Sequence, residues 1–497
     1  RQELMLNAEQ IEFVVPDHTI YRDSIERDTI SCVSRFQNER LRFGLKVHCA
    51  QASLEAILSG LHKSGTSGRL TSLTLADNDI HASEDSTLGQ FSSLTEISLG
   101  KNLCCSDGGR MLAEILGNSK MLTSLDLGHN KLDAAGICAI APYLLLCTDL
   151  RKLYLGKNDF SDHALSVLSG VIGKCKILSH VHLGEIRFVG AGFTSLVKVL
   201  GESSSLSHLH LGRNSLNDCE AEYLGHHGFF SSLHTLHLGS NKIGPPGIAK
   251  MATRLSQYQS LRKLSLGVNR LGDVSIWQLS PNLSKIPNLG WLHLGRNFIG
   301  DSGAIGLGSG IAGCHALTSL FLGSNNIGDE GFQSLAEGLH RCSSLRRLHL
   351  GTNKISDLAF SPTRLQQRSA CCEDEHSLSA FACLTTPMRT HAADNHPPSS
   401  NLQHPWCAHL RHLDLGDNQI GSEGLSVLAR DLSSCTRMDR LHLGRNTMSD
   451  AGLEPLTHAL AASGVNVLCL GSNGFTPFGV ARFLAVVEER CPLLEVE

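Results

Sequence analysis

The chain has 497 residues, of which 41% are hydrophobic and 5% are aromatic, and its formal net charge is -4 at pH 7. Such a small charge favours neither nucleic acid nor a membrane surface as a partner. The 17 cysteines form no CxxC pair and no spacing typical of a secreted disulfide domain. We therefore expect reduced thiols and a cytoplasmic or nuclear protein.

The N-terminal residues 1–40 show no repeat and mix charges with short apolar groups. We expect them to cap the array that follows, because the end of a repeat array exposes a core face. The first residue is Arg1, which suggests a fragment or a processed product. No secretory signal precedes the array, and no apolar run reaches the roughly 18 residues of a membrane helix.

A repeat of mostly 28 residues begins after a degenerate copy at 41–61. The last strand leucine of each copy is found at Leu75, Leu99, Leu127, Leu155, Leu183, Leu211, Leu238, Leu266, Leu294, Leu322, Leu350, Leu415, Leu443 and Leu470. Self-similarity at such a period predicts a solenoid rather than several globular domains.

Each copy begins with a short predicted strand, which is clearest in residues 289–303, LGWLHLGRNFIGDSG. Leu292 and Leu294 alternate with polar or aromatic residues, and this period of two is typical of a strand. We expect Trp291 and His293 to lie on its outer face.

An asparagine follows the strand in every clear copy except the fifth, where Ile186 takes its place. Asn297 is an example. A primary amide both donates and accepts, so it can satisfy backbone groups where a strand stops. We therefore predict an altered loop around Ile186.

The second half of each copy is predicted to be helical. The clearest apolar stripe follows Asp329 and consists of Phe332, Leu335, Ala336 and Leu339. Asp301 is expected to cap its own helix. Glycines should weaken that helix by about 1 kcal/mol each relative to alanine, namely Gly306, Gly308, Gly310 and Gly313. Pro281 should end the preceding helix.

Stacking such repeats forces curvature, because parallel strands lie about 4.8 Å apart whereas packed helices need about 8–10 Å. The predicted fold is an α/β solenoid, or horseshoe, with parallel strands on its concave face and helices on its convex face.

The motif LxLGxNxIGDxG occurs at 292–303 and 320–331 and, with Ser422 in place of Asp, at 413–424. It resembles the ribonuclease-inhibitor-like class of leucine-rich repeats. That class includes ribonuclease inhibitors, Ran GTPase-activating proteins and the sensor domains of nucleotide-binding leucine-rich-repeat receptors. The resemblance implies repeats over 41–357 and 406–497, but it leaves the function open because these proteins share architecture more than task.

The period fails between the two stretches, and residues 358–405 are rich in proline and polar residues. We predict an irregular, disordered insertion, although a translated intron would look similar. Its mixture of Cys371, Cys372, His376, Cys383 and His391 lacks a recognisable zinc-ligand spacing. No metal site is predicted there.

Histidines recur at outward strand positions, including His182, His210 and His237 on successive copies. A flat row is a poor zinc site, because zinc requires ligands that converge tetrahedrally. A solvated binding surface is favoured, with a pH-sensitive partner contact as a further hypothesis. Another recurring position holds Cys147, Cys175, Cys314, Cys342, Cys407 and Cys435, which is typical of a small apolar core position.

The outward and loop positions carry a mild basic bias, which favours a protein partner with an acidic or mixed surface. An exposed Trp with Arg is typical of an interface hot spot. The predicted partner-binding residues are Trp291, His293, Arg296, Phe298, Phe321, Arg347 and His349. The alternative is that Phe298 tucks under its loop and Trp291 merely covers its neighbours.

The sequence contains no phosphate-binding loop, nucleophile elbow or paired-carboxylate motif, so neither an enzyme nor a cofactor is predicted. We expect a scaffold that binds a protein through its concave face. One alternative is a GTPase-activating regulator, although residues 76–87 lack the arginine that the Ran-activator resemblance requires. Lys101 and Lys157 keep that alternative open. The other is the ligand-sensing region of a nucleotide-binding receptor.

Overall fold

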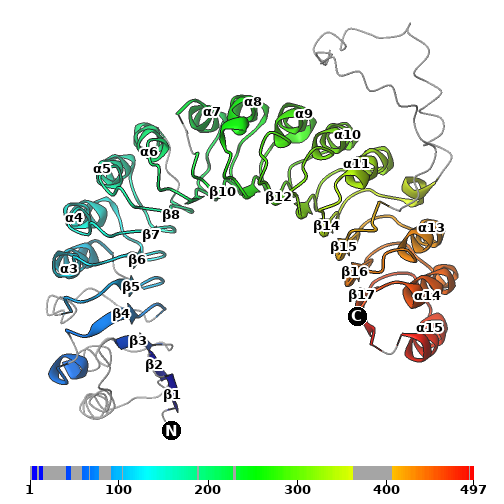
Figure 1. The fold of residues 1–497 in the computed structure, drawn as a ribbon, viewed down its shortest axis with the longest axis horizontal. Coiled ribbons are helices and arrows are strands. Elements are labelled where there is room, and N and C mark those ends of the chain that lie inside the picture. The colour runs from blue at the N-terminus through cyan, green and yellow to red at the C-terminus, as the bar shows by residue number, and fades with distance from the viewer. Residues whose placement is uncertain are drawn as a thin grey trace, which may run out of the picture. The chain divides into compact units, whose positions relative to one another are not determined.

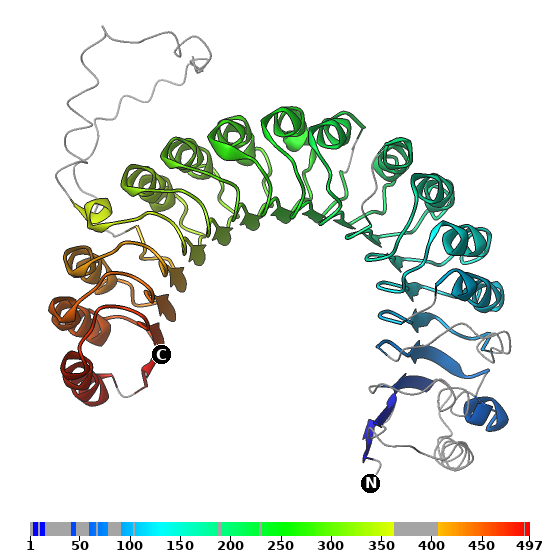
Figure 2. The same cartoon turned by 180° about the vertical axis from the view of Figure 1, so that it is seen from behind.

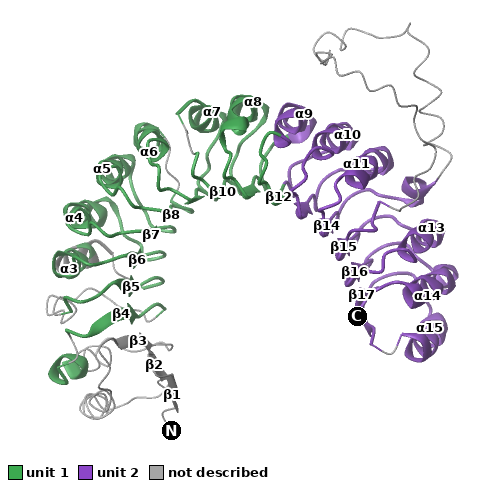
Figure 3. Ribbon diagram, viewed as in Figure 1, with its two compact units in different colours: residues 1–271, 285–293 green, residues 272–284, 294–497 purple. Residues whose placement is uncertain are grey.

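The structure is a computed structural model. It describes residues 3–7, 10–14, 41–45, 59–65, 68–77, 91–102, 105–186, 190–227, 231–361, 406–491 and 493–497. These residues fall into two compact units (Figure 3). Unit 1 comprises residues 1–271 and 285–293, and unit 2 comprises residues 272–284 and 294–497.

Unit 1 alternates short strands with helices along the chain (Figure 1). Its strands are β1 (Glu3–Asn7), β2 (Gln10–Val14), β3 (Leu41–Leu45), β4 (Leu70–Thr74), β5 (Glu96–Ser98), β6 (Ser124–Asp126), β7 (Lys152–Tyr154), β8 (His180–His182), β9 (His208–His210), β10 (Thr235–His237), β11 (Lys263–Ser265) and β12 (Trp291–His293). Its helices are α3 (Cys105–Asn118), α4 (Ala134–Leu144), α5 (Asp162–Ile172), α6 (Ala191–Gly201), α7 (Asp218–His227), α8 (Pro245–Arg254) and the 3-10 turn η2 (Leu255–Gln257).

Unit 2 has the same alternation. Its strands are β13 (Ser319–Phe321), β14 (Arg347–His349), β15 (His412–Asp414), β16 (Arg440–His442), β17 (Val467–Cys469) and β18 (Glu495–Val496). Its helices are α9 (Gly272–Leu283), α10 (Asp301–Ile311), α11 (Asp329–Arg341), α13 (Ser422–Leu432), α14 (Leu453–Ala462) and α15 (Pro477–Arg490), with 3-10 helices η3 (Asp357–Phe360) and η6 (Asp450–Gly452).

Within each unit, successive strands pair in parallel, and the helices lie along one side of the strand row (Figures 1 and 2). The exception is β1, which pairs antiparallel with β2. The middle residue of each short strand faces the helices and is buried, as Leu292 and Leu348 illustrate. The opposite side of the row is called the strand face below. This architecture confirms the predicted α/β solenoid.

The predicted asparagines form a ladder from repeat to repeat. Asn325 donates through Nδ2 to the carbonyls of Leu322 at 2.7 Å and Leu294 at 3.1 Å. Its Oδ1 accepts from the backbone amides of Asn297 at 2.8 Å and Ile299 at 3.2 Å. One side chain therefore satisfies four backbone groups, three of them in the preceding repeat.

The helix caps differ from the sequence prediction for Asp301. Gly300 is the N-cap of α10, and Asp301 is the first residue of that helix. Its Oδ1 accepts from the amides of Gly328 at 2.6 Å and Gly331 at 3.1 Å, at the start of α11. Asp301 therefore caps the helix of the next repeat, because the stacked repeats bring that helix end to its carboxylate. Asp273 supplies the corresponding contact to α10 through the amide of Gly300 at 2.6 Å.

The prediction that Pro281 ends its helix was wrong. Pro281 lies inside α9, which continues to Leu283. Pro281 lies in the last turn, so its missing amide affects only the end of the helix. The glycines of α10 lie where neighbouring helices approach closely: a Cβ at Gly308 would be 2.5 Å from the Ser334 carbonyl oxygen, and one at Gly306 would be 2.9 Å from Trp277. These glycines permit close helix packing.

The repeat continues in register across the predicted insertion. Strand β14 pairs directly with β15, and Asn418 donates to the Leu350 carbonyl at 3.1 Å. Asp357 accepts from the amides of Gly421 and Gly424 at 2.5 and 2.9 Å. In this repeat the four-residue η3 stands where other repeats have an α-helix. Residues 362–405, and the loop at 187–189 after Ile186, lie outside the described residues.

Over the described ranges, no helix combines the length and apolar character needed to cross a bilayer.

Candidate functional site

The strand face of unit 2 contains a groove of about 320 Å³. Strands β14 to β16 form its floor, and apolar, basic and acidic side chains form its walls. The lining residues are Phe321, Arg347, Leu348, His349, His412, Leu413, Asp414, Arg440, Leu441, His442, Val467, Cys469 and Glu497. A hollow lined by apolar side chains and a few polar groups is typical of a binding site.

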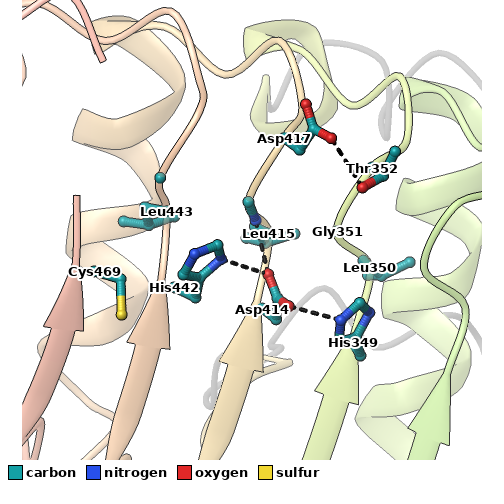
Figure 4. Close-up of polar contacts among 12 residues, drawn as sticks. His349, Leu350, Gly351, Thr352, Asp414, Leu415, Asp417, His442, Leu443 and Cys469 are labelled. Carbon is teal, nitrogen blue, oxygen red and sulfur yellow. Dashed lines mark hydrogen bonds and ion pairs between the residues drawn. The ribbon is translucent and has the colours of Figure 1, made fainter. Parts of the chain in front are cut away.

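At the centre of the groove, Asp414 on β15 joins two imidazoles from the flanking strands (Figure 4). His349 Nε2 lies 2.8 Å from Asp414 Oδ2, and His442 Nδ1 lies 2.8 Å from Asp414 Oδ1. The backbone amide of Gly416 donates to Oδ1 at 2.9 Å. The carboxylate therefore fixes both rings.

These contacts shift the pKa values of the group. Burial raises the pKa of Asp414, but hydrogen bonds from His349 and Gly416 outweigh burial and lower it to about 2. The hydrogen bond to Asp414 raises the pKa of His349 against the opposing effect of burial. An ionised Asp414 next to a protonated His349 is thus the favoured state in mildly acidic solution.

Glycines leave room for the two rings. An added Cβ at Gly323 would overlap the His349 ring, and one at Gly416 would overlap the His442 ring. The glycine that follows each strand is therefore required wherever the next repeat carries an imidazole above it.

Cys469 on β17 is paired in register with His442, which places a thiol beside an imidazole and a carboxylate. Its Sγ donates to Glu497 Oε2 at 3.2 Å. Burial, and next the Glu497 carboxylate, raise the pKa of Cys469 to about 11. A reactive cysteine needs a lowered pKa, so this arrangement does not activate the thiol as a nucleophile.

A second row follows the first positions of the strands, where Arg347, His412 and Arg440 are paired in register. Burial, and next the charge of Arg347, lower the pKa of His412. Arg440 Nε lies 3.9 Å from Asp439 Oδ2. Among the described residues, the Arg347 side chain makes no hydrogen bond or ion pair. The groove therefore has an uncompensated positive charge at its edge.

The predicted partner-binding residues fall in three places. Phe321, Arg347 and His349 line the unit 2 groove. Arg296 and Phe298 lie in the loop before α10 with left-handed φ of 54° and 60°. Phe298 is 74% exposed, so it does not tuck under the loop.

The other two predicted residues, Trp291 and His293, belong to unit 1, where their rings stack with centroids 5.7 Å apart. The sequence analysis missed the bridge from Asp414 to His349 and His442. The repeat pattern could have indicated this bridge. Leu350 and Leu415 are equivalent leucines, so the residues before them, His349 and Asp414, occupy equivalent positions on neighbouring strands.

In unit 1, the predicted histidine row is a stack of rings. The ring centroids of His182 and His210 are 4.0 Å apart, and those of His210 and His237 are 4.1 Å apart. Burial, followed by the neighbouring imidazoles, lowers the pKa of His210 to about 3. Parallel rings do not converge on one point, and no His, Cys, Asp or Glu cluster in the described ranges has the arrangement of a metal site.

The recurring cysteines mostly lie in the core. Cys407 and Cys435 are fully buried, with their Sγ atoms 3.0 Å apart. Burial raises the pKa of Cys147 to about 11 and that of Cys314 to about 12. Such thiols behave as small apolar side chains.

Lys101, one of the two lysines that kept a GTPase-regulating role open, lies near a carboxylate. Lys101 Nζ lies 4.0 Å from Asp77 Oδ2, and both side chains are exposed. Lys101 also has a left-handed backbone with φ of 57°, as do the residues before the ladder asparagines in other repeats. The backbone conformation of Lys101 is thus a general feature of this loop in the repeats.

The buried leucines, the asparagine ladder and the alternation of strand and helix define a leucine-rich-repeat solenoid. A family model described as "Leucine Rich repeat" matches four segments, residues 118–141, 231–252, 313–336 and 407–429. These four segments of the chain are therefore similar to leucine-rich repeats. A comparison with curated proteins finds no match.

Several solved structures are similar to this chain. A leucine-rich-repeat protein of Leptospira interrogans is 17% identical with a TM-score of 0.50, and the match covers 97% of this chain and 100% of that chain. An internalin of Listeria monocytogenes is 18% identical with a TM-score of 0.43, covering 84% of each chain. The ectodomain of the Arabidopsis receptor kinase HAESA, solved with a peptide hormone, is 17% identical with a TM-score of 0.42, covering 94% of this chain and 79% of that chain. At these identities the likeness concerns the fold.

Proposed function

We propose that this protein is a non-enzymatic scaffold whose unit 2 groove binds a segment of another protein. The observation that carries the proposal is the unpaired guanidinium of Arg347 in the same groove as the half-buried ring of Phe321. A partner segment with one acidic and one apolar side chain matches these groups. Arg and aromatic residues around a desolvated pocket are typical of interface hot spots.

The charge of the groove supports an acidic rather than a basic partner segment. Arg347 and Arg440 lie on either side of His412, whereas the Asp414 carboxylate at the centre is already occupied by two imidazoles and a backbone amide. A carboxylate of the partner would therefore meet cations at the edge of the groove. Guanidinium groups bind carboxylates with two parallel hydrogen bonds.

The finer assignments are also proposals. The spacing of 28 residues and helices of ten or more residues in most described repeats support the ribonuclease-inhibitor-like class. The absence of a disulfide among the described cysteines supports a cytoplasmic or nuclear location. No feature of the described residues favours the GTPase-regulating or receptor-sensing alternatives over a scaffold.

The test is quantitative affinity capture with the full chain, followed by direct binding of each captured protein. Arg347→Glu should lower the affinity of a true partner at least tenfold. The substitution replaces the unpaired cation with a carboxylate, which would repel the carboxylate of the partner. Lys354→Glu is the matched control, since it makes the same charge change at an exposed position outside the groove. Equal binding of the two variants to every captured protein would refute the proposal.

A further inference from the structure

The strand face of unit 1 carries a row of residues that we call the imidazole row. It consists of the first residues of β7 to β11, which pair in register in the order Lys152, His180, His208, Thr235 and Lys263. Both lysines are exposed and both histidines are half-buried. The row thus places two titratable rings between two fixed positive charges.

The two rings are stacked on each other. Their centroids are 4.0 Å apart with an interplanar angle of 8°, and the His234 ring continues the stack 6.4 Å from His208. Stacking covers the faces of the rings, so their edge nitrogens are the groups that remain for a ligand.

A neighbouring serine occupies one nitrogen of each ring. Ser179 Oγ lies 3.0 Å from the Arg151 carbonyl oxygen and 2.9 Å from His180 Nδ1. The hydroxyl can both donate and accept, so it is a hydrogen-bond partner of Nδ1. Nε2 is therefore the nitrogen of His180 that remains for a ligand.

The same arrangement repeats one strand later. Ser207 Oγ donates to the Ser179 carbonyl at 3.0 Å and lies 2.9 Å from His208 Nδ1. Nδ1 of His208 is therefore occupied in the same way. A ring that gains a second proton becomes a cation that donates through Nε2.

The surroundings keep both rings neutral in the free protein. Burial, and next Lys152, lower the pKa of His180. Burial, followed by His180, His234 and Lys263, lowers the pKa of His208. Among the described residues, no carboxylate acts on either ring, whereas Asp126 and Glu185 act on His182 of the neighbouring row. The charged groups that act on the two rings are therefore all positive, and a ligand with negative charge would complement them.

We propose that the imidazole row binds an acidic segment of a protein partner and that the ring of His180 or His208 takes up one proton from solution when a carboxylate of the partner is seated against its Nε2. The proton adds to the free lone pair, no other bond breaks, and the resulting imidazolium donates to the carboxylate. Lys152 and Lys263 attract the two ends of the segment. This surface is separate from the unit 2 groove and does not depend on its function.

The length of the row favours a peptide. Four strand spacings of about 4.8 Å separate Lys152 from Lys263, which gives about 19 Å, the span of roughly six extended residues. Two fixed cations over this length suit a short acidic segment. Nucleic acid requires a continuous basic stripe along its phosphates.

The probe is a capped hexaglutamate peptide with a fluorescent label, measured by anisotropy with the full chain at constant ionic strength. The protein carries Arg347→Glu, so that the unit 2 groove does not contribute. We expect the affinity to rise at least tenfold between pH 7.5 and 5.5, where glutamate stays ionised. Calorimetry in two buffers of different ionisation enthalpy should show uptake of about one to two protons per peptide.

Adding His180→Gln and His208→Gln should abolish the pH dependence while leaving the weak binding to the lysines. The matched control adds His182→Gln and His210→Gln in the neighbouring row and should retain the pH dependence. Circular dichroism checks that both variants remain folded. Affinity independent of pH, or pH dependence that survives without His180 and His208, would overturn the proposal. Tighter binding of a thymidine hexanucleotide with the same pH dependence would also overturn it.

Discussion

Replacing Asp301 with alanine should destabilise the helix of the following repeat rather than its own. The change removes an ionised acceptor from the amides of Gly328 and Gly331, at 2.6 and 3.1 Å. Loss of a helix cap costs about 0.5–2 kcal/mol, and hydrogen bonds to charged groups lie at the upper end of such values. We therefore expect about 2 kcal/mol at the start of α11.

Hydrogen exchange of the folded protein measures this effect locally. A loss of about 2 kcal/mol corresponds to roughly thirtyfold faster exchange, and we expect it in peptides that cover residues 328–335. Asp273→Ala is the matched control, because Asp273 caps α10 and its loss should affect residues 300–307 instead. Asp301→Asn retains a neutral acceptor and should have a smaller effect. Faster exchange in the first turn of α10 with an unchanged α11 would refute the inter-repeat cap.

Two further substitutions test packing and charge. Gly308→Ala should lower the midpoint of urea denaturation by an amount equivalent to about 1–3 kcal/mol, because the new Cβ would be 2.5 Å from the Ser334 carbonyl oxygen. The control is Gly170→Ala in α5, where a Cβ meets nothing within 4 Å, and it should be neutral or stabilising. Equal losses of stability in the two variants would contradict this explanation. Asp414→Asn should reduce thermal stability most between about pH 4 and 6.5. The lowered pKa of Asp414 adds stability that is lost as the pH falls toward about 2. The raised pKa of His349 adds stability that is lost as the pH rises above the ordinary pKa of histidine. A stability difference that does not vary with pH would show that the Asp414 bridge carries no net charge effect.

The repeat pattern predicted the strands, the core leucines and the positions of the asparagines because each is set by spacing within one repeat. Contacts between repeats were harder to predict. The carboxylate of Asp301 reaches a helix one repeat later, and the sequence near it equally fits a local cap. The glycines of α10 weaken an isolated helix, yet here they allow close packing, which only the neighbouring helices reveal.

The candidate site was predicted in part. Phe321, Arg347 and His349 were identified as outward residues and do line one groove. Asp414 and His442 complete the groove and follow the insertion in the sequence. The irregular spacing across the insertion gave no indication that they lie close to His349. The hot spot around Trp291, Arg296 and Phe298 stays a prediction. The contacts of Ser179 with His180 and of Ser207 with His208 were not predicted either, because they depend on side-chain geometry.

The asparagine ladder and the aspartate caps between repeats, such as the cap of Asp301 on α11, also limit where the gene can change in length. Both recur with the same spacing in adjacent repeats, so recombination that adds or removes one whole repeat recreates every link. A change of a few codons within the segment from Leu292 to Gly303 would shift the links and break them. The extra residues follow Ser361 in the sequence, after the Asp357 cap and before strand β15, and both the cap and the pairing of β14 with β15 are retained. Such junctions are where a repeat array can acquire new sequence without losing its stacking.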